Sequence, residues 1–294
     1  MRFIPGFIAG APASSIRPSS IRTLALGGAL AAVALLSSGC NKLQARDNLN
    51  KGVNAFKSGQ YSAAADDFKT AIDLDPDFPV ARLYLATAYM QQYVPGSDTP
   101  ENKRNADAAL EQFQKVIDDP KSSPENRLLA TQSLASLYFN LKDFPRAEDW
   151  NKKILAADPN NKEAYYVLGV IAWTNFVVPD REARQQMGMT PEAPGPLKDP
   201  KSKKDPDTKA ELKAKYWPIL TAGIEDEKKA LAIDPEYENA MSYMNLLIRY
   251  RGDLEDNKDQ YLADGKEADS WMQKALETTK KKAAKKSAAA EQTQ

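Results

Sequence analysis

Hydrophobic positions along most of the chain recur with the period of an α-helix. Leu134, Leu137, Tyr138 and Leu141 follow the i, i+3, i+4, i+7 spacing of a helix that buries one face, and residues 83–90 show a similar stripe. No segment alternates between apolar and polar residues as a half-buried strand does. The pattern therefore predicts an all-α fold.

The ends of these predicted helices also recur. An Asp-Pro pair follows an apolar stretch at 75–76, 119–120, 158–159 and 234–235. Proline lacks a backbone donor and disfavours a helical conformation in the residue before it, so each pair ends one helix and precedes the next. Four copies of one helix terminus indicate an array of repeated units.

The first copy shows the internal spacing of the unit. Gly52, Ala64, Phe68 and Pro76 are separated by 12, 4 and 8 residues. This spacing resembles the tetratricopeptide repeat (TPR), a helical hairpin of about 34 residues. The resemblance implies that Gly52 and Ala64 are small where two antiparallel helices cross, and that Phe68 fills the gap toward the next hairpin.

Later copies are altered to different degrees. The third keeps the spacing but has Asn151 in place of the aromatic residue, and the second has about ten extra residues, 92–100, between its helices. The fourth is interrupted before it resumes at Gly223, and a degenerate fifth follows. The resemblance spans 45–276 and implies a right-handed superhelix, or solenoid, of about five TPR-like hairpins.

Two segments interrupt or extend this array. Residues 176–215 are dense in proline and charge, and we expect a solvated insertion loop there, or alternatively a lid or partner-binding strap. Residues 277–294 form a basic low-complexity tail, expected to be a fraying helix end followed by disorder.

The N-terminus has the layout of a secretory signal peptide over residues 1–39. Arg2, Arg17 and Arg22 precede an uncharged run from Leu24 to Leu36, followed by small residues. That run has about 13 residues, whereas a membrane-spanning helix needs about 20. We therefore expect export rather than a transmembrane helix.

The sequence from Leu36 to Cys40 resembles the lipobox of bacterial lipoproteins. This resemblance implies that Cys40 is lipidated and becomes the first mature residue, with 40–44 as a short linker to the solenoid. Asn41 after the cysteine implies the outer membrane, on its periplasmic face.

The amino-acid composition excludes several classes of catalytic and metal site. The chain has no histidine and Cys40 is its sole cysteine, which excludes Ser-His-Asp and Cys-His nucleophile systems, His-ligated metals, zinc ribbons and iron–sulfur clusters. The formal net charge is zero, unlike that of a nucleic-acid binder. We predict no enzyme activity, no metal, no cofactor and no nucleic-acid partner.

Without histidine or a second cysteine, catalysis would depend mainly on carboxylates. The alternative to a non-enzymatic protein is therefore a cell-wall glycosidase that uses two carboxylates. The acidic clusters at 66–67, 118–119 and 225–227 are expected on outer helix faces or at helix ends, as solvated charge.

Stacked hairpins leave a concave surface lined by the first helix of each repeat, wide enough for a peptide or a helix. By repeat register the candidate partner-binding residues are Phe56, Met90, Phe139, Tyr166, Trp173, Arg249 and Tyr250, with Leu49, Val53, Leu83, Thr87, Gln132, Ser136, Val170, Ser242 and Leu246 beside them. Leu49, Val53 and Gln132 stand where chaperone-binding relatives place the residues that hold a C-terminal carboxylate, so that type of clamp is not supported. Packing of the aromatic rings against neighbouring hairpins is the alternative.

The leading functional hypothesis is a membrane-anchored scaffold that binds envelope proteins in this groove. Accessory roles in outer-membrane protein assembly, pilus biogenesis or regulation of cell-wall hydrolases all remain open, as does self-association through the solenoid ends.

Overall fold

A computed structural model describes residues 40–190, 195–198 and 207–291. The predicted all-α fold is confirmed, since these residues contain helices and no strand. The predicted signal peptide, 1–39, lies outside the described residues. After a helix over 40–57, the helices are α2 (Tyr61–Leu74), α3 (Pro79–Gln92), α4 (Pro100–Asp118), α5 (Pro124–Asn140), α6 (Phe144–Ala157), α7 (Lys162–Gln186), α8 (Thr208–Ile233), α9 (Glu238–Asp253) and α10 (Lys258–Glu291).

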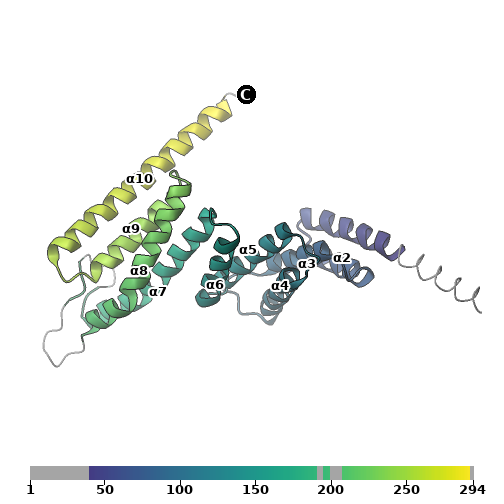
Figure 1. Cartoon of the computed structure of the whole chain (residues 1–294), viewed down its shortest axis with the longest axis horizontal. Coiled ribbons are helices and arrows are strands. Elements are labelled where there is room, and N and C mark those ends of the chain that lie inside the picture. Colours follow the sequence, from purple (N-terminus) through teal and green to yellow (C-terminus); the bar gives the residue numbers. More distant parts are fainter. Residues whose placement is uncertain (1–39, 191–194, 199–206, 292–294) are drawn as a thin grey trace, which may run out of the picture.

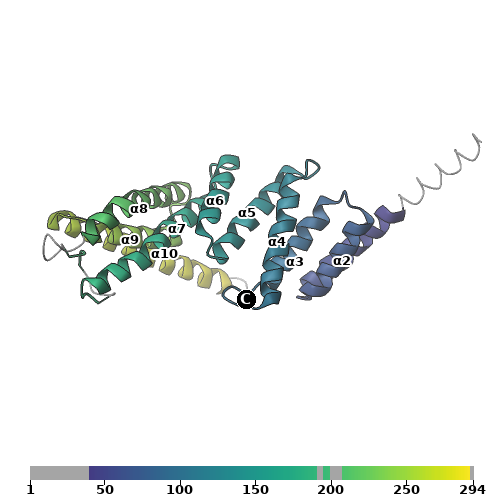
Figure 2. The same cartoon turned by 90° about the horizontal axis from the view of Figure 1, so that it is seen from below.

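Consecutive helices of the described residues pair into five hairpins. The first four follow one another along the long axis of the molecule, and the fifth lies beside the fourth (Figures 1 and 2). In the four hairpins that lie wholly within the labelled helices, the first and second helices are α3 and α4, α5 and α6, α7 and α8, and α9 and α10. The leading hairpin joins the helix over 40–57 to α2. The described part of the chain is thus a helical solenoid.

Local sequence explains where several helices begin. The side chains of Thr99, Ser123 and Asp143 each accept a hydrogen bond from the backbone N–H three residues later, and a proline occupies the first turn that follows each of them. Such side chains satisfy one of the free N–H groups at a helix start, and proline has no N–H to leave unpaired there.

The leading hairpin confirms the predicted roles of Gly52 and Phe68. A Cβ atom at Gly52 would lie 2.5 Å from the Phe68 ring, so the helices approach closely because glycine has no side chain. Phe68 is fully buried and stacks on Tyr84 of α3, with ring centroids 5.4 Å apart. One aromatic residue thereby links the first and second hairpins.

The proline-rich insertion is narrower than the predicted range 176–215. α7 continues through Pro179 to Gln186, and α8 already begins at Thr208 and contains Pro218. A proline inside a helix costs about 3 kcal/mol, but burial of residues such as Phe176 and Tyr216 offsets that cost.

The described part of the insertion is held against the core. The backbone N–H of Leu197 donates to the Asp253 carbonyl at 3.0 Å, and the Leu197 side chain is 2% exposed. Arg184 donates through both terminal nitrogens to the Gly195 carbonyl at 3.2 Å. These residues are therefore a packed strap, not a solvated loop.

Two predicted boundaries also differ at the ends. Residues 40–44 are helical and continue into the first helix, rather than forming a separate linker. The tail predicted over 277–294 is helical to Glu291, because α10 packs along α9 and its lysines reach acidic residues at the start of that helix. Lys281 binds Glu236 at 2.6 Å, and Lys282 binds Glu238.

The boundary between the third and fourth hairpins has the least packing between helices. α3 packs against α5 and α7 against α9, whereas α5 does not pack against α7. Among the labelled helices, only α6 and α7 pack across this boundary. Space is therefore left on both sides of the α6–α7 contact.

Candidate functional site

Aromatic side chains form a continuous row between α7 and α9, the first helices of the last two hairpins. Tyr243 lies at its centre, 5.4 Å from the ring centroid of Tyr166 and 5.7 Å from that of Trp173. Tyr237 adjoins Tyr166 at 5.4 Å, and Tyr250 adjoins Trp173 at 6.3 Å. Most contacts are edge-to-face, the geometry that aromatic pairs prefer.

These rings are partly buried, so part of each ring packs against neighbouring side chains and part is exposed to solvent. Burial raises the pKa of Tyr166 and of Tyr237 to about 12, and both phenols stay neutral at physiological pH. The Trp173 Nε1–H is buried and has no hydrogen-bond partner among the described residues. The partly exposed rings thus offer apolar surface with tyrosine hydroxyl groups, whereas the indole N–H of Trp173 is enclosed.

The structure brings together only part of the predicted groove set. Tyr166, Trp173 and Tyr250 belong to the aromatic row, and the exposed Arg249 next to it binds Asp269 of α10. The remaining predicted residues lie in the three earlier hairpins and are half-buried: Phe56 against Tyr61, Met90 against the core of the second and third hairpins, and Phe139 against Phe144.

A pocket of about 360 Å³ lies between α5, α6 and α7, where α5 and α7 are apart. We call it the first-helix pocket. Phe139 from the predicted set lines it, beside Gln132 and Ser136 of the same helix. Asn151 of α6 also lines the pocket, although the residue is only 3% exposed. This pocket extends the predicted groove toward the second helix of the hairpin.

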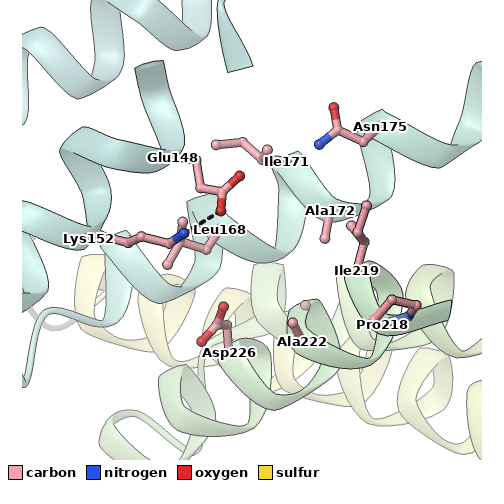
Figure 3. A pocket seen from close by; sticks show the side chains of 11 residues that line it. Glu148, Lys152, Leu168, Ile171, Ala172, Asn175, Pro218, Ile219, Ala222 and Asp226 are labelled. Carbon is pink, nitrogen blue, oxygen red and sulfur yellow. Dashed lines mark hydrogen bonds and ion pairs between the residues drawn. The ribbon is translucent and has the colours of Figure 1, made fainter. Parts of the chain in front are cut away.

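A second pocket, of about 330 Å³, lies between α6, α7 and α8, and we call it the second-helix pocket (Figure 3). Leu168, Ile171 and Ala172 of α7 line it, as do residues of α6 and α8. Its charged residues include Glu148, which binds Lys152 at 2.5 Å, and Asp226. Burial raises the pKa of Asp226, which binds Lys229 at 3.2 Å.

Glu227 overturns the expectation that residues 225–227 are solvated. It is 0% exposed, and neither carboxylate oxygen has a hydrogen-bond partner among the described residues. A Cβ atom at Gly169 would lie 2.2 Å from Glu227 Oε1, so the carboxyl group occupies the space that this glycine leaves. Burial, and secondarily the charge of Asp226, raises the pKa of Glu227 to about 10, so it is protonated at neutral pH.

A buried charge cluster fixes the far end of the fourth and fifth hairpins. Arg184 donates to Asp180 at 2.8 Å and to Asp253 at 2.6 Å. Burial raises the pKa of both carboxyl groups, to about 7 for Asp253, although Arg184 opposes the shift. Because Arg184 also holds Gly195, the cluster ties the insertion to α7 and α9 and has a structural role.

The described residues contain no group of three or more Cys, Asp or Glu side chains arranged to hold a metal ion. No helix among them has both the length and the apolar character needed to cross a membrane.

The sequence indicated that Asn151 replaces an aromatic residue, but the roles of Glu227 and Tyr243 were not predicted, although the repeat spacing held a signal for Glu227. Asn151 follows Ala147 by four residues and Glu227 follows Gly223 by four, just as Phe68 follows Ala64. That register places both polar residues in the buried aromatic position. Tyr243 gave no such signal, because its role depends on how α7 and α9 face each other.

Comparison with known proteins agrees with this architecture. A "TPR repeat" family model matches residues 55–92, and a "Tetratricopeptide repeat" model matches residues 101–162. Among curated proteins, none matches the sequence.

Solved structures with a similar fold include the crystal structure of MamA protein. It has a TM-score of 0.51 and 18% identity, and the alignment covers 82% of this chain and 94% of MamA. MamA from residue 41 to its end, from Desulfovibrio magneticus RS-1, has a TM-score of 0.51 and 16% identity, with 81% and 96% covered. At these identities the similarity concerns the fold alone. The matched segments, 55–92 and 101–162, are thus tetratricopeptide repeats, and the stacked hairpins of the described residues have the fold of such repeats.

Proposed function

We propose that this protein is an exported, lipid-anchored scaffold that binds partner proteins of the bacterial cell envelope through the surface formed by its first helices. The aromatic row between α7 and α9 is the observation that carries the proposal. Partly exposed Tyr and Trp rings on rigid helices provide apolar contact area at low cost in side-chain entropy, and such residues dominate the energetics of protein interfaces.

The lipobox-like sequence before Cys40 supports the anchor. Cys40 is exposed and is the first described residue of the helix over 40–57. Each buried acyl methylene contributes about 0.8 kcal/mol, so two or more chains hold a protein stably on a membrane. The helix over 40–57 and the aromatic row lie near opposite ends of the molecule (Figure 1), which leaves the row away from an anchored end. Asn41 favours the periplasmic face of the outer membrane.

The arrangement of Glu148, Asp226 and Glu227 fits a scaffold better than a glycosidase, which needs two carboxyl groups facing one substrate position. Glu148 and Asp226 both line the second-helix pocket, but each forms an ion pair with a lysine of its own helix. The protonated Glu227 is enclosed between helices and does not line that pocket. This arrangement provides no free acid–base pair facing one substrate position.

Partner capture tests the proposed surface. The native protein and a Trp173→Ala variant are crosslinked in intact bacterial cells, and bound proteins are identified by mass spectrometry. Val178→Ala is the matched control, because Val178 is an exposed apolar residue of the same helix outside the row. Loss of one envelope protein from Trp173→Ala alone supports the proposal. Equal recovery by all three chains contradicts it. The captured protein also distinguishes roles in outer-membrane assembly, pilus biogenesis and hydrolase regulation.

Fractionation tests the anchor separately. Wild type is expected in the outer-membrane fraction and to incorporate a labelled fatty acid, whereas Cys40→Ser is expected in the soluble periplasmic fraction without label. Unchanged membrane association of Cys40→Ser would show that Cys40 is not the anchor.

A further inference from the structure

Equivalent positions in the first and third hairpins hold very different side chains. Phe68 and Asn151 each lie four residues after a small residue, Ala64 or Ala147, and eight before a proline. Phe68 is fully buried and reaches Tyr84 of the next hairpin, so it fills the space between adjacent first helices. The third hairpin has an amide where this aromatic ring would lie.

Asn151 does not fill the corresponding space. Its Nδ2 donates to the Ala147 carbonyl at 2.8 Å, within its own helix. Its Oδ1 has no hydrogen-bond partner in the part of the chain that the structure describes. The residue is 3% exposed, yet it lines the first-helix pocket of about 360 Å³, at the boundary where α5 and α7 do not pack together. Because this oxygen is not fully enclosed, it can accept a hydrogen bond from water or from a ligand in the pocket.

The walls of this pocket define the ligand. Five apolar residues from α5, α6 and α7 surround it, and Gln132 and Ser136 add polar groups beside Asn151. Among the described residues, Glu163 is the only charged one that lines the pocket, and no lysine or arginine does. The pocket therefore suits a neutral, apolar group flanked by hydrogen-bonding groups, and it disfavours an anion. The apolar lining residues are Ala135, Phe139, Ile154, Ala164 and Val167.

We propose that the first-helix pocket binds one large apolar side chain, such as phenylalanine, of an extended peptide segment, whose peptide groups hydrogen-bond to Asn151 and Gln132. The inference rests on the proposed scaffold function and names the feature of the partner that is recognised. A cavity of about 150 Å³ accommodates benzene, so about 360 Å³ holds an aromatic side chain and the peptide groups beside it. Because no lysine or arginine of the described residues lines the pocket, we infer an internal segment rather than a C-terminal carboxylate.

The probe that tests this pocket is N-acetylphenylalanine amide, titrated into the full chain in detergent. Methyl NMR signals of Ile154 and Val167 report occupancy. We expect saturable shifts at millimolar concentration, at least ten-fold weaker binding of N-acetylphenylalanine with its free carboxylate, and no binding of N-acetylglycine amide. Equal binding of all three compounds, or no shift with the amide probe, would overturn the proposal.

Two variants connect this binding to Asn151. Asn151→Phe places in the third hairpin the residue type that Phe68 provides in the first, so the fold is retained while the pocket is filled and probe binding is lost. Asn151→Ala keeps the pocket but removes the amide, and we expect about ten-fold weaker binding. Asn175→Phe is the matched control, because Asn175 lines the second-helix pocket. Unchanged affinity in both Asn151 variants contradicts the proposed site.

Partner capture separates this inference from the scaffold proposal. If Trp173→Ala loses the partner and Asn151→Phe retains it, the scaffold stands and the pocket proposal falls. If both variants lose it and Asn175→Phe retains it, both proposals are supported. If the wild type captures no specific partner but binds the probe in an Asn151-dependent way, the scaffold proposal fails and the pocket stands as a peptide site.

Discussion

The first and fourth hairpins have the same close contact between their two helices, but the side chain at that contact is apolar in the first and polar in the fourth. In each, a glycine of the first helix, Gly52 or Gly169, lets a side chain of the second helix lie directly against its backbone. That side chain is the apolar ring of Phe68 in one hairpin and the carboxyl group of Glu227 in the other, and both are 0% exposed. Repeat spacing thus fixes where a side chain goes, whereas its chemistry determines whether burial stabilises the protein or costs stability.

The largest expected effect is the loss of Phe68. Truncation to alanine removes a fully buried ring and leaves a cavity between two hairpins, so Phe68→Ala should lower the free energy of unfolding by about 3–5 kcal/mol. Urea titration followed by circular dichroism measures the change. Glu227→Ala should cost clearly less, because it also removes a buried carboxyl group without partners. Equal losses would show that the two hairpins do not differ in the proposed way.

The second prediction concerns the pH dependence of stability. The pKa of Glu227 is about 10 in the folded protein and about 4.5 when unfolded, so between these values the folded state holds a proton that the unfolded state has lost. Stability should therefore fall as the pH rises, on the order of 4 kcal/mol between pH 5 and pH 8. Asp253 contributes with the same sign up to its pKa of about 7.

Glu227→Gln isolates this contribution. The variant keeps the shape of the side chain and cannot titrate, so the difference between its stability and that of the wild type should grow with pH. Urea unfolding at pH 5, 6, 7 and 8 provides the data. Parallel curves for the two proteins would contradict a raised pKa at Glu227.

A smaller effect is expected at the turn of the third hairpin. Lys142 has a φ of 58°, in the left-handed region, and its backbone bonds match those of Gly59, which has a φ of 75° in the first hairpin. Glycine tolerates this conformation better, so Lys142→Gly should raise the free energy of unfolding by about 1 kcal/mol. Lys152→Gly, in the middle of α6, is a contrasting control that should lower it.

The smallest effect is expected at the basic end of α10. Glu238→Lys replaces an attraction to Lys282 with repulsion, so the thermal midpoint should fall slightly and the end of α10 should lose helicity. High salt should remove the difference, because ions screen exposed charges. Thermal unfolding by circular dichroism at about 0.05 M and about 1 M salt measures it, and an effect that persists at high salt would point to packing instead.

The repeat spacing predicted the stacked helical hairpins correctly, but several predicted segment boundaries were wrong. The Asp-Pro pairs and the positions of Gly52, Ala64 and Phe68 correctly indicated stacked helical hairpins. The prediction that the insertion begins at 176 was wrong, because the helix α7 continues through Pro179 to Gln186. Proline disfavours a helix locally, but burial of Phe176 and the ion pair between Arg184 and Asp180 stabilise this part of α7. Of the predicted groove residues, Tyr166, Trp173 and Tyr250 meet in one row.

By itself, the sequence determined the helical class, the repeat unit and the small residues at helix crossings, because these depend on local spacing and on backbone sterics. The tertiary structure alone decided that Glu227 is buried and protonated, that Tyr243 joins the aromatic row, and that a pocket opens beside Asn151. Each of these depends on how far apart neighbouring hairpins lie. That distance results from side chains distant in sequence packing together, which no local pattern records.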